Sequence, residues 1–181
     1  MFKKICYSIL IILGVVMTAN AADISDDNIL IMQLKSGDVK IQMFENVAPN
    51  HVKRIKELVN AGFYDGIKFH RVIDGFMAQT GDPKGDGTGG SGQNIKAEFS
   101  DVKHERGVVS MARAQNVNSA DSQFFIMLDD APHLDGQYTA WGKVISGMEY
   151  IDQIQKGDSR MNGTVGNPDQ IISLKLASNI Q

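Results

Sequence analysis

The segment from Phe69 to Asp82 reads FHRVIDGFMAQTGD, and it contains two short runs with β-strand character. In the first run Arg71 lies among apolar neighbours, where a cation must reach solvent or a polar partner. In the second run Met77 and Gln79 fall on the same side of a strand. Each of these residues alone is consistent with ordinary packing or a surface salt bridge. Their meaning depends on the rest of the chain.

Outward from this segment, the pattern predicts many short strands and few helices. Ile29 to Lys35 and Val39 to Met43 form a hairpin around Ser36-Gly37-Asp38, and helical spacing of apolar residues runs from Pro49 to about Ala61. The other predicted elements are strands at Lys68 to Ile73, Phe76 to Thr80, Val108 to Ala112, Phe124 to Leu128, Thr139 to Val144 and Ile171 to Leu176, and a short helix at Met148 to Gln155. This pattern favours one domain built as a small antiparallel barrel or sandwich.

The amino terminus has the pattern of a secretory signal. A short cationic stretch precedes the apolar run Ile5 to Met17, and Ala19 and Ala21 match the small residues of a cleavage site. We expect residues 1–21 to be cleaved, after Ala21 or Ala22, leaving residues 22–28 as a polar lead-in. The alternative is an uncleaved anchor, which a run this short disfavours.

Cleavage there would change the composition of the chain. The only cysteine, Cys6, would be lost, so the mature protein would suit an oxidising compartment but have no disulfide. Loss of Lys3 and Lys4 changes the formal net charge from −3 to −5. This charge argues against nucleic acid or an anionic membrane surface as the main partner, and no other segment is expected to insert into a membrane.

The sequence lacks the residue patterns that are typical of several functional classes. The glycine-rich stretch Gly81 to Gly92 has neither the Gly-Lys-Ser/Thr ending of a phosphate loop nor the aspartate spacing of a calcium loop, so an irregular loop is expected. No nucleophile elbow is present, and Ser110 has no base nearby in the sequence, which leaves its spatial neighbours open. His70 is better explained as a packed strand residue than as a general base. No metal or cofactor is expected, since paired ligand spacing is absent among His51, His70, His104 and His133.

The run from Gln123 to Leu128 is unusual because both of its faces carry large apolar groups. Period two places Phe124 with Ile126 on one face, and Phe125 with Gln123 on the other. One face can pack in a core. The other must be either a second packing layer or a recognition pocket.

Together these segments resemble the cyclophilin family of peptidyl-prolyl cis-trans isomerases. The resemblance covers Ile29 to about Leu176, and we expect the domain to span residues 29–178. It rests on five further ordered motifs: Gly87-Thr88-Gly89-Gly90, Ser110-Met111-Ala112-Arg113-Ala114, Ser122-Gln123-Phe124-Phe125-Ile126, His133-Leu134-Asp135-Gly136 and Trp141-Gly142-Lys143-Val144, after the segment Phe69 to Asp82. It implies a mainly β fold, a closed eight-stranded antiparallel barrel capped by two α-helices, with the substrate groove on its outer wall.

The resemblance also implies a metal-free isomerase that rotates X-Pro bonds in unfolded or flexible proline-containing polypeptides. Arg71 would be the charged donor to the prolyl amide. The implied catalytic set is Arg71, Gln79, Phe76 and Phe125, and the implied substrate-binding set is Met77, Gly87, Ala112, Arg113, Gln123, Leu134, His133 and Tyr138. A non-catalytic module or holdase of the same fold, gripping proline-containing segments, is the alternative.

Three departures from the family pattern refine these expectations. His133 stands where cyclosporin-sensitive members carry Trp, so cyclosporin binding should be weak. Tyr138 stands where many relatives have His. Arg113 replaces the Asn of eukaryotic members, and residues 115–121 are similar to the bacterial form, which indicates the periplasm of a Gram-negative cell. A single domain without a coiled coil makes a monomer the default.

Overall fold

The computed structural model describes residues 25–180, so the predicted signal segment 1–21 lies outside the described residues. The strands are β1 (Ile29–Leu34), β2 (Gly37–Met43), β3 (Arg71–Ile73), β4 (Met77–Thr80), β5 (Val108–Met111), β6 (Phe124–Met127), β7 (Ala140–Ser146) and β8 (Ser173–Leu176). The helices are α1 (Pro49–Asn60), α2 (Met148–Asp152) and the 3₁₀ turns η1 (Asp26–Asn28), η2 (Pro132–Leu134), η3 (Ser159–Met161) and η4 (Ala177–Asn179).

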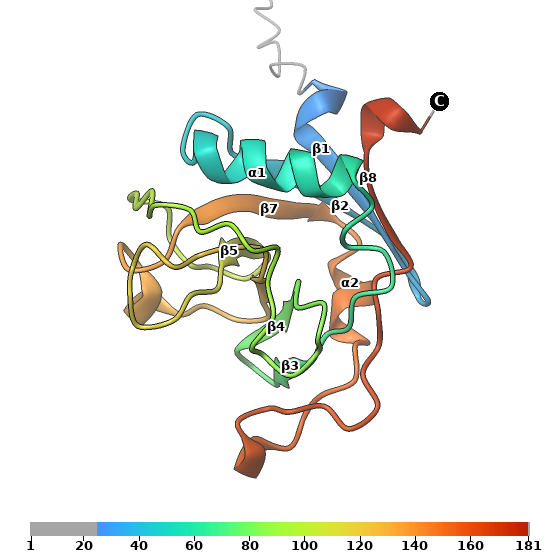
Figure 1. The fold of residues 1–181 in the computed structure, drawn as a ribbon. Coiled ribbons are helices and arrows are strands. Elements are labelled where there is room, and N and C mark those ends of the chain that lie inside the picture. Colours follow the sequence, from blue (N-terminus) through green and yellow to red (C-terminus); the bar gives the residue numbers. More distant parts are fainter. Residues whose placement is uncertain (1–24, 181) are drawn as a thin grey trace, which may run out of the picture.

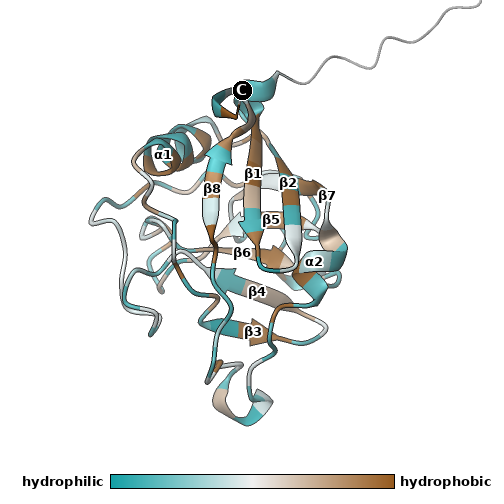
Figure 2. Ribbon diagram, turned by 90° about the vertical axis from the view of Figure 1, so that its right-hand side faces the viewer, coloured by the Kyte–Doolittle hydropathy of each residue, from teal (hydrophilic) through white to brown (hydrophobic). Residues whose placement is uncertain are grey.

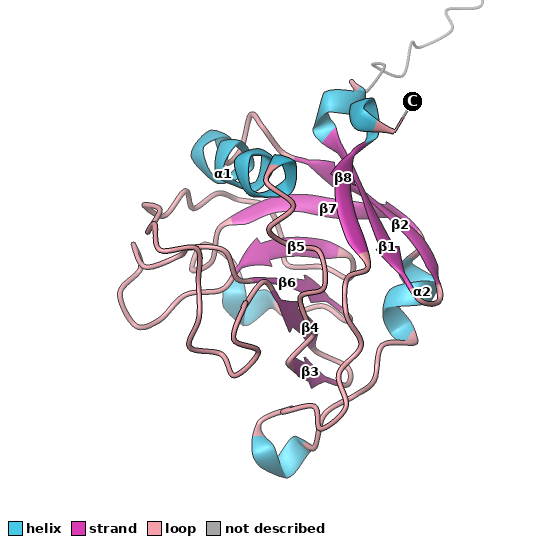
Figure 3. Cartoon of the chain, turned by 45° about the vertical axis from the view of Figure 1, so that its right-hand side comes forward, coloured by secondary structure: helices cyan, strands magenta, loops and turns pink. Residues whose placement is uncertain are grey.

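The eight strands form one antiparallel sheet in the order β3-β4-β6-β5-β7-β2-β1-β8. Figure 3 shows the sheet curling, so that β1, β2 and β8 cross the direction of β3, β4, β5 and β6. The described amino-terminal end lies beside the carboxy-terminal end, where η1 and η4 are in contact (Figure 1).

The predicted closed barrel was wrong, because the sheet is an open half-barrel with β3 and β8 as its edges. Between these edges runs the segment 163–171, which makes only isolated bridges, Arg71 with Thr164 and Lys68 with Gln170. Gly163, Gly166 and Pro168 explain the gap, since glycine weakens a strand and proline cannot donate to a ladder. The eight antiparallel strands and two α-helices were predicted correctly.

Most predicted elements are present, with ends that differ by a few residues. The hairpin pairs Leu34 with Gly37, so its turn is Lys35-Ser36 and not Ser36-Gly37-Asp38. The strand predicted at Lys68 to Ile73 is shorter in the structure, where β3 covers only Arg71–Ile73 and Lys68 makes an isolated bridge. The stretch Gly81 to Gly92 is irregular, as predicted, and four of its glycines have positive φ: Gly81, Gly85, Gly87 and Gly92.

The main core lies inside the curl of the sheet and beneath α1. The ring of Phe124 makes T-shaped contacts with the rings of Tyr64 and Trp141, at a centroid distance of 5.4 Å in both cases. Helix α1 buries Val52, Ile55 and neighbouring residues against this core. Figure 2 shows both brown and teal residues around α1, as expected of a helix with one buried face. Among residues 25–180, no helix has the length and apolar character needed to cross a membrane.

Candidate active site

A small cavity of about 180 Å³ lies on the outer face of β3, β4 and β6. It brings together nine of the twelve predicted site residues, which come from segments more than sixty positions apart in the chain. These nine are Arg71, Phe76, Met77, Gln79, Ala112, Arg113, Phe125, Leu134 and Tyr138. Gly87 and Gln123 line an adjoining cavity of about 320 Å³, which shares Gln79, Ala112 and Arg113 with the first.

Strand register explains why the central residues meet. Arg71 on β3 pairs with Gln79 on β4, and Gln79 pairs with Phe125 on β6. Directly opposed residues in antiparallel strands point to the same face. A row of guanidinium, amide and phenyl groups therefore crosses the outer wall, and Met77, two residues before Gln79, lies on the same face.

Three neutral acceptors hold the Arg71 guanidinium. Its Nη1 donates to Gln79 Oε1 at 3.1 Å, its Nε donates to the carbonyl oxygen of Asn162 at 3.0 Å, and its Nη2 donates to Asn162 Oδ1, also at 3.0 Å. Burial lowers the pKa of Arg71, but a guanidinium stays protonated in proteins. Among the described residues no carboxylate pairs with it, so its positive charge is uncompensated.

A hydrogen-bond chain continues from Arg71 to the glycine-rich loop. Gln79 Nε2 donates to Gln123 Oε1 at 2.9 Å, and Gln123 Nε2 donates to the carbonyl oxygens of Gly87 and Gly89 at 3.1 and 2.8 Å. The buried carboxylate of Asp82 fixes this loop by accepting from the backbone N–H groups of Lys84, Asp86 and Gly87. Burial alone would raise the pKa of Asp82, but these hydrogen bonds outweigh it and lower the pKa.

Aromatic rings form the wall on the other side of the cavity. Tyr138 meets Phe125 edge to face at 5.7 Å, and the guanidinium carbon of Arg113 lies 4.6 Å from the centre of the Tyr138 ring. His133 differs from the other predicted residues because it lines neither cavity. Its exposed ring lies 5.7 Å from that of Phe76, at the outer rim.

The structure answers the open question about Ser110. Its Oγ lies 2.9 Å from His104 Nε2, and His104 Nδ1 lies 3.2 Å from Asp135 Oδ1. This resembles a hydrolase triad, but Ser110 is 0% and His104 2% exposed, so a substrate cannot reach them. Ser110 pairs with Phe125, and the His104 ring stacks on Phe125 at 6.5 Å. Ser110 and His104 therefore hold Phe125 in the cavity wall, and Asp135 holds the His104 ring.

The sequence did not reveal the roles of two further residues, Asn162 and His104. Asn162 contacts Arg71 although 91 residues separate them, and the only local signal was the Asn162-Gly163 dipeptide, which is typical of a turn. The neighbours of Ser110 carried no sequence signal. His70 is buried and burial lowers its pKa, which agrees with a packed residue that stays neutral.

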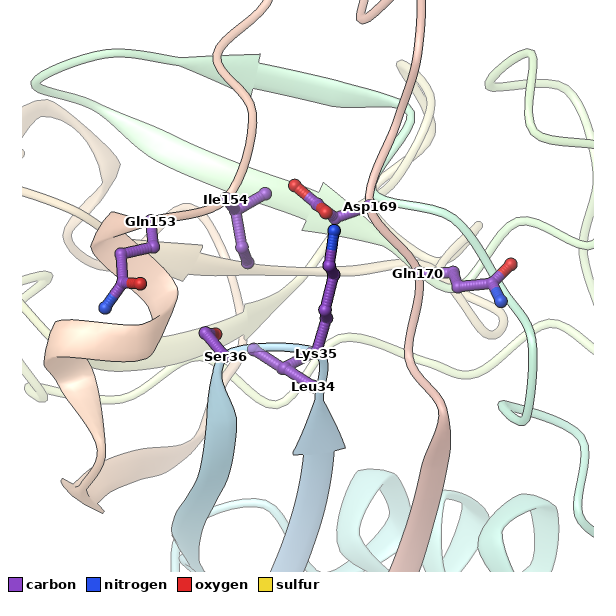
Figure 4. A pocket seen from close by; sticks show the side chains of 7 residues that line it. All are labelled: Leu34, Lys35, Ser36, Gln153, Ile154, Asp169 and Gln170. Atoms are coloured by element: carbon purple, nitrogen blue, oxygen red, sulfur yellow. The ribbon is translucent and has the colours of Figure 1, made fainter.

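A larger cavity, of about 360 Å³, lies away from this row, where the β1–β2 turn approaches the end of α2 and residues 169 and 170. Figure 4 shows Lys35 extending toward Asp169 there. None of the strand residues around Arg71 lines it, and Asp169 already accepts a hydrogen bond from the Gln155 N–H. Residues 25–180 contain no group of three His, Cys, Asp or Glu side chains placed to hold a metal ion.

The geometry suits a reaction in which no covalent bond is broken. The groups that line the cavity are an apolar wall, amides that can hydrogen-bond a peptide, and the guanidinium groups of Arg71 and Arg113, which no carboxylate of the described residues pairs with. Arg71 is half-buried, and a cation beside an apolar wall interacts more strongly with an amide than it would in open water, because less water screens it. The arrangement can bind a peptide and stabilise a changed electron distribution in one of its amides.

The comparisons with known proteins agree with this geometry. Residues 29–176 match the family model described as cyclophilin type peptidyl-prolyl cis-trans isomerase/CLD. A probable peptidyl-prolyl cis-trans isomerase of Brucella suis is 52% identical over 176 residues, covering 91% of this chain and 89% of the relative. Peptidyl-prolyl cis-trans isomerase B of Bacillus subtilis is 44% identical over 122 residues, covering 66% of this chain and 85% of the relative.

Two solved structures show the same architecture. A cyclophilin from Hirschia baltica has a TM-score of 0.78 at 28% identity and covers 87% of this chain and 77% of its own. A cyclophilin type isomerase from Cryptosporidium parvum, crystallised in the presence of the dipeptide Ala-Pro, has a TM-score of 0.75 at 30% identity and covers 82% of this chain and 98% of its own. The chain therefore belongs to the cyclophilin-type peptidyl-prolyl cis-trans isomerase family, and it is an isomerase of that type.

Proposed function

We propose that X-Pro bonds rotate in the cavity of about 180 Å³, with Arg71 as the donor that lowers the barrier. The prolyl ring would contact Phe76, Met77, Phe125 and Leu134, and the guanidinium would contact the prolyl amide. The observation that carries this proposal is the uncompensated charge of Arg71 beside an apolar wall. A donor to the amide nitrogen favours its pyramidal form and so weakens the double-bond character of the C–N bond.

The required stabilisation is modest. Amide rotation has a barrier of about 18 to 20 kcal/mol, and the uncatalysed exchange takes about 10 to 100 s. A turnover of about 10 per second therefore needs roughly 4 kcal/mol of preferential binding of the transition state. One charged hydrogen bond in a site with little water, together with burial of the prolyl ring, can supply this amount.

The adjoining cavity would bind the residues that precede proline. Ala112 and Arg113 line both cavities and would offer backbone groups to these residues, and Gly87 and Gln123 line the second cavity. The natural substrates would be flexible proline-containing segments of exported proteins, bound by a monomer. The Met1 to Ala21 pattern supports export, and the bacterial character of residues 115–121 supports the periplasm of a Gram-negative cell.

Fractionation of cells, with amino-terminal sequencing of the mature protein, tests the proposed export. A mature chain that starts at Ala22 or Asp23 in the periplasm is expected, and an unprocessed cytoplasmic chain would contradict the proposal.

Mapping of a bound peptide tests the position of the site. An Ala-Pro-containing tetrapeptide should shift the amide resonances of residues 71–79, 111–113 and 123–125 in the ¹⁵N-labelled protein, and exchange cross-peaks between the cis and trans peptide should appear. Shifts confined to the residues around Lys35 and Asp169 would contradict the proposed site. Binding without exchange would favour the non-catalytic binding module.

Weak binding of cyclosporin is also expected. His133 is exposed and lies at the rim beside Phe76, outside both cavities, and imidazole offers less apolar surface than the indole of cyclosporin-sensitive members. Inhibition should therefore be weak for the wild type and stronger for His133→Trp. Nanomolar inhibition of the unmodified protein would contradict this expectation.

A further inference from the structure

The segment that carries Asn162 is fixed directly onto the strand that carries Arg71. Val72 N–H donates to the Gly163 carbonyl at 2.8 Å, and Gly157 N–H donates to the Val72 carbonyl at 2.9 Å. A β-carbon on Gly163 would collide with Ile73, so the loop approaches β3 as closely as only glycine permits. In Figure 1 this dark orange segment, with η3, extends past β3. Asn162 therefore has a defined position relative to Arg71.

Asn162 has an unusual backbone conformation. Among residues 25–180 it is the only non-glycine residue with positive φ, at 54°, and Asn tolerates this left-handed region better than most residues. In this conformation its own carbonyl oxygen and its side-chain Oδ1 both accept from Arg71, each at 3.0 Å. Glycine would adopt the same backbone without the second acceptor.

The hydrogen bonds leave part of the guanidinium free. An arginine has five N–H donors, and Asn162 and Gln79 occupy three of them. The second N–H on Nη1 donates only weakly, to the Met77 sulfur at 3.8 Å, so this donor and one on Nη2 can turn to a ligand. The side of the guanidinium formed by Nε and one Nη2 hydrogen is held, while the other side lines the cavity.

The charge of the holding groups distinguishes Arg71 from most other arginines of the described chain. Arg54, Arg106 and Arg160 pair with carboxylates, those of Glu57, Asp152 and Asp158. Arg71 has only neutral acceptors. A carboxylate at position 162 would hold the guanidinium as well, but it would offset the charge on which an interaction with the prolyl amide depends.

We propose that Asn162 is a positioning residue of the isomerase reaction, which orients the Arg71 guanidinium with two neutral acceptors and leaves its charge available to the substrate. This inference rests on the role of Arg71 proposed above. Preorganised donors need little reorganisation when the transition state forms, so loss of one acceptor should lower the turnover more than the binding of the substrate.

Two substitutions test separately whether the Oδ1 acceptor of Asn162 is needed and whether it must be uncharged. Asn162→Gly keeps the backbone conformation and the carbonyl acceptor but removes Oδ1, and kcat should fall about tenfold with a nearly unchanged KM. Asn162→Asp keeps an oxygen acceptor but adds a negative charge, and kcat should fall at least as far. Arg160→Gln is the matched control in the same loop, because its side chain bonds only Asp158, and its activity should equal that of the wild type.

A double-mutant cycle with Arg71→Ala decides between positioning and a general effect on the loop. In the Arg71→Ala background, Asn162→Gly should lower activity no further, because both changes remove the same function. An equal additional loss, or full activity of Asn162→Gly or Asn162→Asp, would overturn the inference while leaving the role of Arg71 intact. If Arg71→Ala itself keeps full activity, the proposed role of Arg71 fails first. Unfolding in urea, measured for each variant, shows that the losses occur in folded protein.

Discussion

The two faces of strands β4, β5 and β6 are both apolar, but they do different things. The inner face belongs to the main core, where Phe124 packs against Tyr64 and Trp141. The outer face belongs to a second cluster, in which Phe125 and Met77 pack with Leu134. The outer cluster opens to the cavity of about 180 Å³ that Arg71 also lines. The inner face therefore mainly provides stability, and the outer face provides the site.

Burial alone does not distinguish the two faces, since Phe124 is 0% and its neighbour Phe125 only 5% exposed. The groups that surround Phe124 and Phe125 do distinguish the two faces. Phe124 is enclosed by aromatic rings, whereas Phe125 lines the cavity and has His104 and Tyr138 beside it. Substitutions at these adjacent positions should therefore separate stability from activity.

The largest effect is expected for Phe124→Ala on the inner face. Removing a fully enclosed phenyl ring leaves a cavity, and the free energy of unfolding should fall by about 3 to 5 kcal/mol in urea titrations. The protein that remains folded should keep its wild-type activity. If the free energy of unfolding falls by less than about 1 kcal/mol, or if fully folded Phe124→Ala protein loses activity, the distinction between the two faces is contradicted.

A smaller effect on stability and a larger one on activity are expected for Phe125→Ala. Loss of the apolar wall should lower kcat/KM by about 30-fold, which corresponds to about 2 kcal/mol of contact with the prolyl ring. Phe125→Leu, which keeps much of the apolar surface, is the matched variant and should retain more activity. The comparison fails if Phe125→Ala loses activity only in proportion to its unfolded fraction.

The smallest effect is the contribution of a single histidine ring to the pH dependence of stability. Burial lowers the pKa values of His51, His70 and His104, so these rings stay neutral in the folded protein, while in the unfolded chain they take up protons below about pH 6.5. The free energy of unfolding should therefore fall as the pH drops from 7.5 to 5, by at most about 1.4 kcal/mol per pH unit for each ring.

Two carboxylates act in the same direction at lower pH. Hydrogen bonds lower the pKa values of Glu98, against the effect of burial, and of Asp135, so their contribution is lost as the pH falls through the folded values. Urea titrations at several pH values measure the slope. His104→Asn, which removes one of the buried rings, should reduce it. A flat or inverted pH dependence would contradict this account.

The strand pattern of the sequence predicted the outer face well, because local alternation sets which side chains share a face. The alternation in Gln123 to Leu128 placed Phe124 and Phe125 on opposite sides, as the structure has them. The strand pairing that aligns Arg71 with Gln79 and Phe125 was not predicted; the family resemblance only placed these residues in one site.

Features that depend on contacts between distant segments were not predictable in this way. The open edge between β3 and β8 depends on the path of residues 163–171, and barrel closure was expected instead. The contact of Asn162 with Arg71 and the packing of His104 against Ser110 arise from tertiary structure, since neither pair forms a local motif.

The central claim is that Arg71 lowers the rotation barrier, and one measurement tests it most directly. The exchange rate of an Ala-Pro peptide is measured by NMR for the wild type and Arg71→Ala, together with the free energy of unfolding of both. We predict that kcat/KM falls about 100-fold, as for loss of a charged donor, while stability changes by less than about 1 kcal/mol. Full activity of a stably folded Arg71→Ala protein would contradict the account.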